Sequence, residues 1–522
     1  MLCRMTDAAI EGATGELHRR LRAVCDLAVA SVREESGRHE YDGTIQELDA
    51  AGVEAALRRV GGGPARADAG VEAHLAAFED AARLRFGELE MHRRDPLLHV
   101  TNLDVSCYDR SYAPEEERAQ AQRRHLALWP EGVEAAVRTL DAVPAPVAKV
   151  ASGIARGLAG GLDDDLPGHA AARAAVDRLV AHLDTCARTG SPDAALGPDA
   201  LAALMSCGEG KRPDLHRLTR LATDELARLR DALEQECRRL DPHRQATEVV
   251  AELHADHPTD PATLNAEVAE LVAEITAFCR DEDLVPYTDG ELRIGPPPPS
   301  RMWAMAMMAW SAPDEPDAPS WYWLTPPDPS WDPEDVAAWQ AVFCRASLPA
   351  ITAHEVVPGH LAHARALRRV VAPERRILHS PSFVEGWAHY AEEMLVEVGF
   401  RGGDPRFRIG VCLEALVRIT RLAVAIGLHT GEMDLPEAVD RFRRDALLGG
   451  VAARAEAERG LVEPTYGRYA WGKLAVRDVA DRARLAWGDG FSRSRLHRSL
   501  LALGSPPLAL LDQIIEDRVL DA

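Results

Sequence analysis

The hydrophobic positions of this chain recur mostly at helical spacing. In residues 15–35 the side chains of Leu17, Leu21, Val24 and Leu27 follow one another at intervals that place them on one face of a helix. Ala, Leu, Arg and Glu, which are strong helix formers, are abundant throughout. The first half is therefore predicted to be a stack of amphipathic helices with Gly- or Pro-rich connections. The same pattern returns in residues 70–87, 115–141, 170–187, 216–240 and 262–281.

The pattern changes near residue 284. Residues 285–294 contain Asp289-Gly290 between apolar positions, and Asp-Gly is a typical turn of a β-hairpin. Residues 303–310 and 320–325 are rich in Trp or Met and are bounded by prolines, which favours edge strands. We therefore predict a small sheet over residues 284–331. Its edge is expected either to bind an extended substrate through main-chain hydrogen bonds or only to shape the wall of a cleft.

Helical patterns resume after the predicted sheet. Asp332-Pro333 is typical of a helix start, with a capping residue followed by a proline in the first turn. The predicted fold class is mainly α, and the 522 residues are ample for a hydrophobic core. We expect one continuous unit made of two halves. These are an N-terminal helical half (1–283), which forms one wall of a cleft, and a metal-binding half (284–522) with the small sheet (284–331), the helices of the candidate site (333–400) and the C-terminal helices (405–522).

The charge and the cysteines narrow the class of protein. The formal net charge is -23, which disfavours binding to nucleic acid. The nine cysteines include no Cys-x-x-Cys pair, as expected for reduced thiols in a cytoplasm. Residues 1–11 do not resemble a secretory signal, and no apolar run approaches the roughly 18 residues of a membrane span. We therefore predict a cytoplasmic protein without a membrane segment.

Candidate metal-binding and catalytic side chains are concentrated in the stretch His354-Glu355-Val356-Val357-Pro358-Gly359-His360. A catalytic zinc ion takes three protein ligands and leaves a fourth position for water, and two His with one Glu is a common ligand set. On a regular helix, a separation of six residues rotates the second histidine by about 240° from the first. Pro358 cannot donate a helical hydrogen bond, and Gly359 adopts dihedral angles that other residues avoid. We therefore predict a break that returns His360 to the side of His354.

The next predicted helix begins at Ser380-Pro381 and supplies the third ligand, Glu385. His389 and Glu392 follow on the same face, where either is a candidate to support a ligand ring. His389 is also an alternative ligand in place of His360. Glu355 is the predicted general base, which takes a proton from water and passes it to the leaving group. The same ligands also accept Mn, Fe or Co, so zinc is the first expectation among several metals.

These motifs resemble the bacterial family known as domain of unknown function 885. The resemblance covers most of the chain and is sharpest over residues 350–480. It is carried by the stretch 354–361, by Phe383-Val384-Glu385-Gly386-Trp387-Ala388-His389-Tyr390-Ala391-Glu392, by residues 418–431 and by residues 463–474. The family is grouped with gluzincin-like zinc metallopeptidases, so the resemblance implies a helical peptidase-like fold with a deep cleft. It also implies zinc on His354, His360 and Glu385.

The resemblance implies further site residues. Tyr469 is a candidate donor to the oxyanion of a tetrahedral intermediate, with a core tyrosine as the alternative. His429 fits the pattern as a second residue that steadies the oxyanion. Arg421 fits as a ligand for a substrate carboxylate or as half of a structural ion pair. The chain departs from many relatives at Leu361, where they carry a second histidine, and here the next histidine is His363.

The predicted function is a zinc-dependent hydrolase of a peptide or other amide bond, with a small peptide or small amide as substrate. A first alternative is a metal-dependent enzyme of small-molecule metabolism that acts on a non-peptide substrate. A second alternative is a non-catalytic helical scaffold. The presence of His354, Glu355, His360 and Glu385 together argues against the scaffold.

Overall fold

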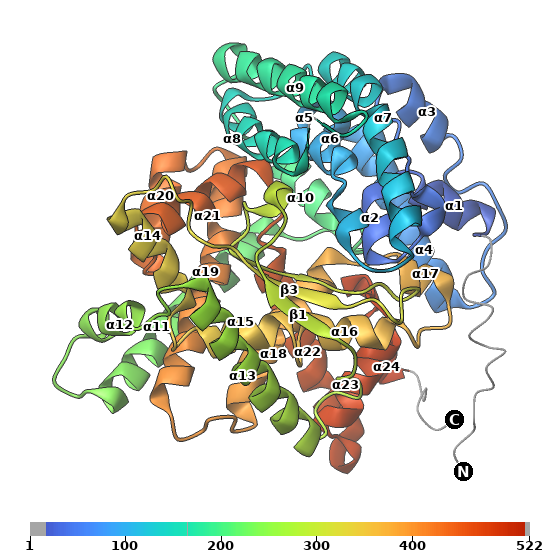
Figure 1. Ribbon diagram of the computed structural model, residues 1–522. Coiled ribbons are helices and arrows are strands. Elements are labelled where there is room, and N and C mark those ends of the chain that lie inside the picture. The colour runs from blue at the N-terminus through green and yellow to red at the C-terminus, as the bar shows by residue number, and fades with distance from the viewer. Residues whose placement is uncertain (1–16, 164, 517–522) are drawn as a thin grey trace.

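The computed structural model describes residues 17–163 and 165–516, most of which are helical. Helices α1 to α9 form the upper and right-hand part of the view in Figure 1, and a small sheet crosses the middle of the molecule. Helices α15, α16, α18 and α22 lie beneath the sheet in the same view. The mainly α fold class predicted from the sequence is therefore confirmed.

The helices that precede the sheet include every segment predicted from apolar periodicity. The segment 15–35 is two helices, because the backbone leaves the helical region at Ala28, with φ -144° and ψ 35°. The segment 70–87 is α4 followed by a π-helical turn, Arg83–Glu88. The helices are α1 (Arg19–Cys25), α2 (Val29–Glu35), α3 (Ala50–Leu57), α4 (Ala69–Ala82), α5 (Met91–Arg94), α6 (Pro96–Leu103), α7 (Glu115–Thr139), α8 (Ala145–Arg156), α9 (His169–Thr189), α10 (Pro198–Ser206), α11 (Leu215–Leu240), α12 (Ala246–Ala255) and α13 (Pro261–Asp281).

The sheet has three strands in the order β1-β3-β2. Strand β1 (Leu292–Gly295) pairs in parallel with β3 (Ser320–Leu324), and β2 (Ala306–Ala309) pairs with β3 in antiparallel orientation. The strands predicted in residues 303–310 and 320–325 are thus confirmed. Strand β2 has a neighbour on one side only, so it is an edge strand.

The hairpin predicted for residues 285–294 is wrong. Residues 285–291 form no strand, and β1 pairs with β3 rather than with a neighbour across an Asp-Gly turn. Gly290 has a φ of 104°, and a Cβ there would lie 2.5 Å from the guanidinium carbon of Arg365. Gly290 therefore allows this loop to pack closely against Arg365. It does not form a tight turn between two strands.

Helices follow the sheet to the end of the described chain. The Asp332 side chain accepts hydrogen bonds from the backbone of Glu334 and Asp335, as predicted for a helix cap. These helices are α14 (Pro333–Gln340), α15 (Leu348–Glu355), α16 (His360–Leu367), α17 (Pro373–Ile377), α18 (Pro381–Glu397), α19 (Pro405–Thr430), α20 (Leu435–Asp445), α21 (Gly450–Val462), α22 (Arg468–Trp487), α23 (Arg493–Ala502) and α24 (Gln513–Glu516).

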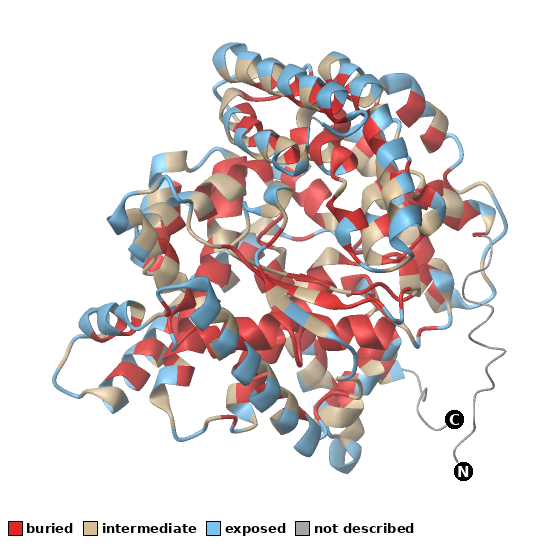
Figure 2. Cartoon of the chain, in the orientation of Figure 1, coloured by how far each residue is buried: buried red, intermediate tan, exposed pale blue. Residues whose placement is uncertain are grey.

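Two large hydrophobic clusters cross the boundary at residue 283. One runs from Leu201 to Ile514 and the other from Val100 to Tyr466. Figure 2 shows that β3 and helices α15, α16 and α18 are largely buried. Among the described residues, no helix combines the length and apolar character needed to cross a bilayer. The described cysteines are all free thiols, while Cys3 and the start of the chain lie outside the described residues.

Candidate metal centre

The break predicted between the two histidines is confirmed. Helix α15 ends at Glu355 and α16 begins at His360, so both histidines lie at helix ends. The connecting turn is closed by a hydrogen bond of 3.0 Å from the Gly359 N–H to the Ala353 carbonyl oxygen. The imidazole rings of His354 and His360 consequently lie 4.7 Å apart between centroids and nearly perpendicular, at 86°.

Gly359 is required by this turn. A Cβ at residue 359 would lie 2.6 Å from the carbonyl oxygen of Ala353 and closer still to the carbonyl oxygen of His354. The turn is also held from α18, because the Trp387 indole donates a hydrogen bond of 3.0 Å to the Pro358 carbonyl oxygen. Pro358-Gly359 therefore brings His360 beside His354 in two ways. It interrupts the helix, and it allows the backbone of the turn to pack closely.

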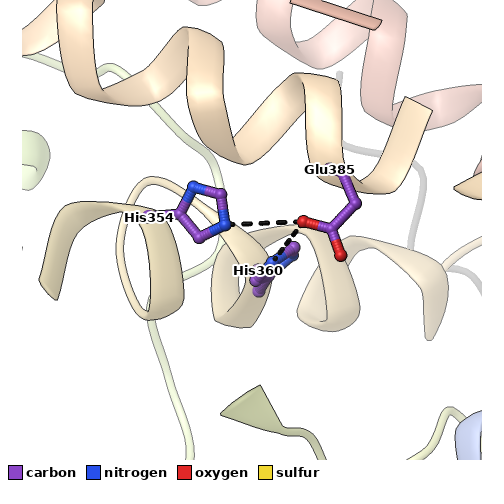
Figure 3. Close-up of side chains that lie close together, drawn as sticks. All are labelled: His354, His360 and Glu385. Carbon is purple, nitrogen blue, oxygen red and sulfur yellow. Dashed lines mark ion pairs between the residues drawn. The ribbon is translucent and has the colours of Figure 1, made fainter. Parts of the chain in front are cut away.

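Glu385 completes a group of three potential ligands (Figure 3). It lies in the second turn of α18, whose first turn is capped by the Ser380 hydroxyl. Its Oε2 lies 3.5 Å from Nε2 of His354 and 3.5 Å from Nε2 of His360. One ligand atom from each residue lies within 4.8 Å of the others. His389, the alternative ligand, is not in this group.

The spacing of the three residues suits a small tetrahedral cation. Zinc bonds of about 2.0–2.2 Å at tetrahedral angles place neighbouring ligand atoms about 3.3–3.5 Å apart. The two measured separations from Glu385 Oε2 agree with this value. That oxygen is buried and makes no hydrogen bond within the described chain. The residues therefore fit a zinc ion in donor type and in the two separations from Glu385.

The charges at the centre are strongly coupled. Burial and nearby Arg418 disfavour the imidazolium form of His354, but its ion pair with Glu385 and its hydrogen bond to Glu392 outweigh them and raise its pKa to about 9. Burial disfavours the charged form of Glu385, yet the two histidines hold the pKa of its carboxyl well below the usual range. In the absence of a cation, the carboxylate is thus stabilised by positive imidazole charge, which a metal ion would replace.

Glu392 holds the ring of His354 through the nitrogen that faces away from Glu385. Its Oε1 accepts a hydrogen bond of 2.7 Å from Nδ1 of His354, which leaves Nε2 free to face Glu385. The same oxygen lies 3.2 Å from an Arg418 nitrogen, and Oε2 lies 3.5 Å from Nδ1 of His389. Glu392 therefore occupies the supporting position considered from the sequence. His389 contacts this support and lies outside the ligand group.

Tyr469 lies directly against the centre. Its ring stacks on that of His354, with centroids 6.1 Å apart and planes at 16°. Its hydroxyl oxygen accepts a hydrogen bond of 3.0 Å from Arg459, whose Nε donates to Glu463 at 2.8 Å. Burial raises the pKa of the Tyr469 phenol to about 12, although Arg459 acts in the opposite direction. The phenol is therefore protonated at neutral pH and able to donate a hydrogen bond.

The position of Tyr469 depends on a close crossing of α18 and α22. A Cβ at Gly386 would lie 2.5 Å from the Cα of Gly472, and one at Gly472 would lie 2.9 Å from the Cα of Gly386. The two helices therefore touch through their backbones. Glu385 precedes one glycine by a single residue and Tyr469 precedes the other by three, so the crossing places both beside the same space.

Three other residues named in the sequence analysis, and Lys473 within the stretch 463–474, have structural contacts. His429 lies at the end of α19, where its Nε2 donates to the Gly460 carbonyl oxygen at 2.8 Å, and burial lowers its pKa to about 4. His429 borders neither of the two cavities at the centre, so its ring does not face the space beside the candidate ligands. Arg421 forms a two-point ion pair with Glu456, with both bonds at 2.7 Å. His363 contacts the backbone and side chain of residues 504 and 505, and Lys473 pairs with Glu225 and Glu393.

Two cavities meet at the centre. The larger has a volume of about 670 Å³ and lies between α2, α4, α6 and strand β2. The smaller, of about 100 Å³, lies between the start of β2 and helices α19 and α21. Both are bordered by His354, Glu355 and Tyr469. The Glu355 carboxylate accepts no hydrogen bond within the described chain, which leaves it available at the junction.

Arg459 is the main residue at the site that the sequence reasoning missed. Its spacing of four residues from Glu463 predicts a helical ion pair, and that pair is present at 2.8 Å. The contact with Tyr469 joins the end of α21 to the start of α22. It depends on the angle between these helices, for which the local sequence contains no signal.

Comparisons with known proteins agree with the fold and leave the activity open. A structure of a putative lipoprotein of unknown function from Shewanella oneidensis has a TM-score of 0.74 at 16% identity and covers 96% of this chain and 100% of its own. A putative lipoprotein from Colwellia psychrerythraea has a TM-score of 0.76 at 16% identity, with coverage of 97% and 98%. No curated protein matches the sequence. The model of the bacterial protein family of unknown function DUF885 matches residues 30–515, and the chain therefore belongs to this family.

Proposed function

We propose that this protein is a zinc-dependent hydrolase of peptide or other amide bonds, with a centre arranged as in gluzincin-like metallopeptidases. The observation that supports this most is the placement of Glu385 Oε2 at 3.5 Å from both His354 Nε2 and His360 Nε2. The support of His354 by Glu392 strengthens the case, because a carboxylate behind a ligand histidine is usual in catalytic zinc sites.

The chemistry that a zinc ion supplies in such a site is the polarisation of a carbonyl group and the activation of water near neutral pH. Glu355 follows the ligand His354 directly and borders both cavities, where it accepts the proton of the attacking water. It then passes that proton to the nitrogen of the leaving group as the C–N bond breaks. Hydrolysis thus adds water across the amide bond without any other reactant.

Tyr469 stabilises the negative charge that develops on the carbonyl oxygen. Because Arg459 donates to the phenol oxygen, the O–H hydrogen of Tyr469 is free to point into the cavity. The positive charge of Arg459 beside the phenol also strengthens this donor. Arg459 is therefore a positioning residue for Tyr469.

The outer edge of β2 is suited to hold an extended peptide. The hydrogen bond from Thr325 N–H to Met305 carbonyl oxygen sets the register of the antiparallel pair. By the alternation of such pairs, Ala306 and Met308 direct their N–H and C=O groups away from β3. Within the described chain these groups have no partner outside the sheet, and both residues border the larger cavity. A peptide at this edge gains main-chain hydrogen bonds beside Glu355.

The site favours short substrates. The larger cavity, of about 670 Å³, is lined by helices of both halves of the chain, and this volume accommodates a short peptide or small amide but not a folded domain. We therefore propose short peptides or small amides as substrates and predict that folded proteins are poor ones. The cytoplasmic location expected from the sequence remains a prediction.

The variant Glu355→Gln tests the proposal. A panel of peptides of two to eight residues is incubated with the zinc-loaded protein, and products are identified by mass spectrometry. We expect hydrolysis by the wild type, and for Glu355→Gln a loss of kcat of about 10²- to 10⁴-fold with zinc content unchanged. Glu131→Gln, on the exposed face of α7, is the matched control and should keep full activity. Equal turnover by Glu355→Gln would remove the assignment of the base, and absence of any hydrolysis by the wild type would contradict the proposed function.

A further inference from the structure

The two cavities at the centre differ in size and in what surrounds them. The cavity of about 670 Å³ is bordered by the whole of β2, whereas the one of about 100 Å³ is bordered by that strand only at its first residue, Ala306, and by the preceding Met305. Glu355 and Tyr469 stand at the junction of both. A substrate bond cleaved at the junction therefore leaves one part in a large space and the other in a small one.

The direction of β2 decides which part of a peptide enters the small cavity. The strand runs from Ala306, near the small cavity, toward Trp310, whose ring centroid lies 6.1 Å from that of His360. A peptide that adds to this edge in antiparallel orientation, the more stable pairing, runs the opposite way. Its C-terminal end then points toward Ala306 and the small cavity.

Two guanidinium groups on the wall of the small cavity have unused N–H donors that can bind a ligand. Arg421 uses Nε and Nη2 on Glu456, and Arg459 uses Nε on Glu463 and Nη2 on Tyr469. In both, Nη1 donates to no other part of the described chain. Both guanidinium groups lie over the ring of Tyr469, because the guanidinium carbon of Arg421 is 4.9 Å and that of Arg459 is 5.7 Å from the ring centroid.

The acidic groups around this cavity do not occupy the unused Nη1 donors of Arg421 and Arg459. Glu456 is already bound by Arg421, and Glu414 is bound by Arg418 at 2.8 Å. Glu355 stands at the entrance and faces the reacting bond. A carboxylate that enters from the junction therefore meets the two unused Nη1 donors, and hydrogen bonds between charged groups of this kind are short and strong.

We propose that the small cavity is the subsite for the free α-carboxylate of a substrate's C-terminal residue, held by Arg421 and Arg459. The protein would then be a carboxypeptidase, which releases single residues from the C-terminus of short peptides. This rests on the proposed hydrolase function and adds the position of cleavage and the chemical group that is recognised.

A panel of matched peptides tests the position of cleavage. N-acetylated tripeptides are offered as the free acid and as the C-terminal amide, with either Leu or Glu as the last residue. We expect the C-terminal residue to be released from the free acids, with kcat/KM lower by about tenfold or more for the amides, because each loses hydrogen bonds to charged groups. Equal cleavage of acid and amide, internal cleavage, release of an N-terminal residue, or cleavage of the Glu amide at the rate of the acids would each overturn the proposal.

A binding measurement separates this proposal from the proposed function. Zinc-loaded Glu355→Gln is titrated by calorimetry with N-acetyl-trialanine and with its amide. We expect the free acid to bind about tenfold or more tightly than the amide. Equal affinity would overturn the subsite whether or not the wild type hydrolyses peptides, while tighter binding of the acid supports it even if no hydrolysis is found.

A steric variant locates the subsite. Ala455 is half-buried on α21 and borders only the small cavity, so Ala455→Phe reduces its space without removing a polar group. We expect kcat/KM for C-terminal Leu to fall relative to C-terminal Gly by about tenfold or more. Ala227→Phe, on the exposed face of α11, should leave this ratio unchanged. An unchanged ratio in both variants would place the C-terminal residue elsewhere and contradict the proposal.

Discussion

Replacement of Gly359 by alanine is the sharpest test of how this chain assembles its centre. The new Cβ would lie 2.6 Å from the Ala353 carbonyl oxygen, whereas real Cβ atoms keep at least 3.0 Å, so the turn must open by about 0.4 Å. The clash with the His354 carbonyl oxygen is more severe and demands a larger shift. Ligand distances in zinc sites are held to within about 0.2 Å, and His360 is the next residue in the chain. We therefore expect His360 to leave its ligand position.

The expected result is a large loss of zinc affinity with the fold retained. Removal of a group that only supports a ligand costs about 10- to 100-fold in affinity, so displacement of a ligand itself should cost more than about 100-fold. Zinc affinity is measured by competition with a chromophoric chelator, and the fold by circular dichroism. Gly403→Ala is the matched control, because a Cβ there meets no atom within 4 Å. Wild-type zinc affinity in Gly359→Ala would refute the view that the tight turn creates the site.

Three further predictions concern the surroundings of the centre. Glu392→Gln should weaken zinc binding by about 10- to 100-fold, measured by the same competition, since it removes the charged acceptor behind His354. Tyr469→Phe should lower kcat by about 10²- to 10³-fold and leave zinc content unchanged, and an equal kcat would exclude the phenol as the oxyanion donor. Burial lowers the pKa of His125 to about 3, so between pH 6.5 and 4 the unfolded chain binds a proton there that the folded chain does not. The free energy of unfolding should thus fall on acidification by up to about 1.4 kcal/mol per pH unit from this residue, and urea unfolding of His125→Gln at pH 6.5 and 5 should show a shallower loss.

Local sequence patterns were sufficient for much of this site. The helical fold followed from apolar periodicity, and the ligand group followed from donor types and from the interruption at Pro358-Gly359. These features are short in range, because His354 and His360 are joined by one turn. Glu385 was predicted on the helix that starts after Ser380, which is α18, because Ser380-Pro381 marks a helix cap and first turn.

The features that could not be predicted depend on distant contacts. Asp289-Gly290 has the local preference of a hairpin turn, but the position of Arg365 determines how Gly290 is used. The pairing of β1 with β3 in parallel joins residues 28 positions apart, as in Leu292 with Ser320. The roles of His429 and Arg459 were likewise decided by which helix ends meet, and no local pattern encodes that.

The contact between Gly386 and Gly472 separates the positioning of Glu385 and Tyr469 from the shaping of the cavities beside them. Because the helices meet backbone to backbone at this point, no side chain there acts as a spacer between the proposed ligand Glu385 and the phenol of Tyr469. The walls of the two cavities belong mainly to other elements, including α2, α4, α6, α19 and α21. Substitutions in those walls can therefore retune which molecules are admitted while the reactive groups keep their mutual distances. If the proposed function holds, this arrangement allows the selectivity of the cavities to change without moving the groups proposed to carry out the reaction.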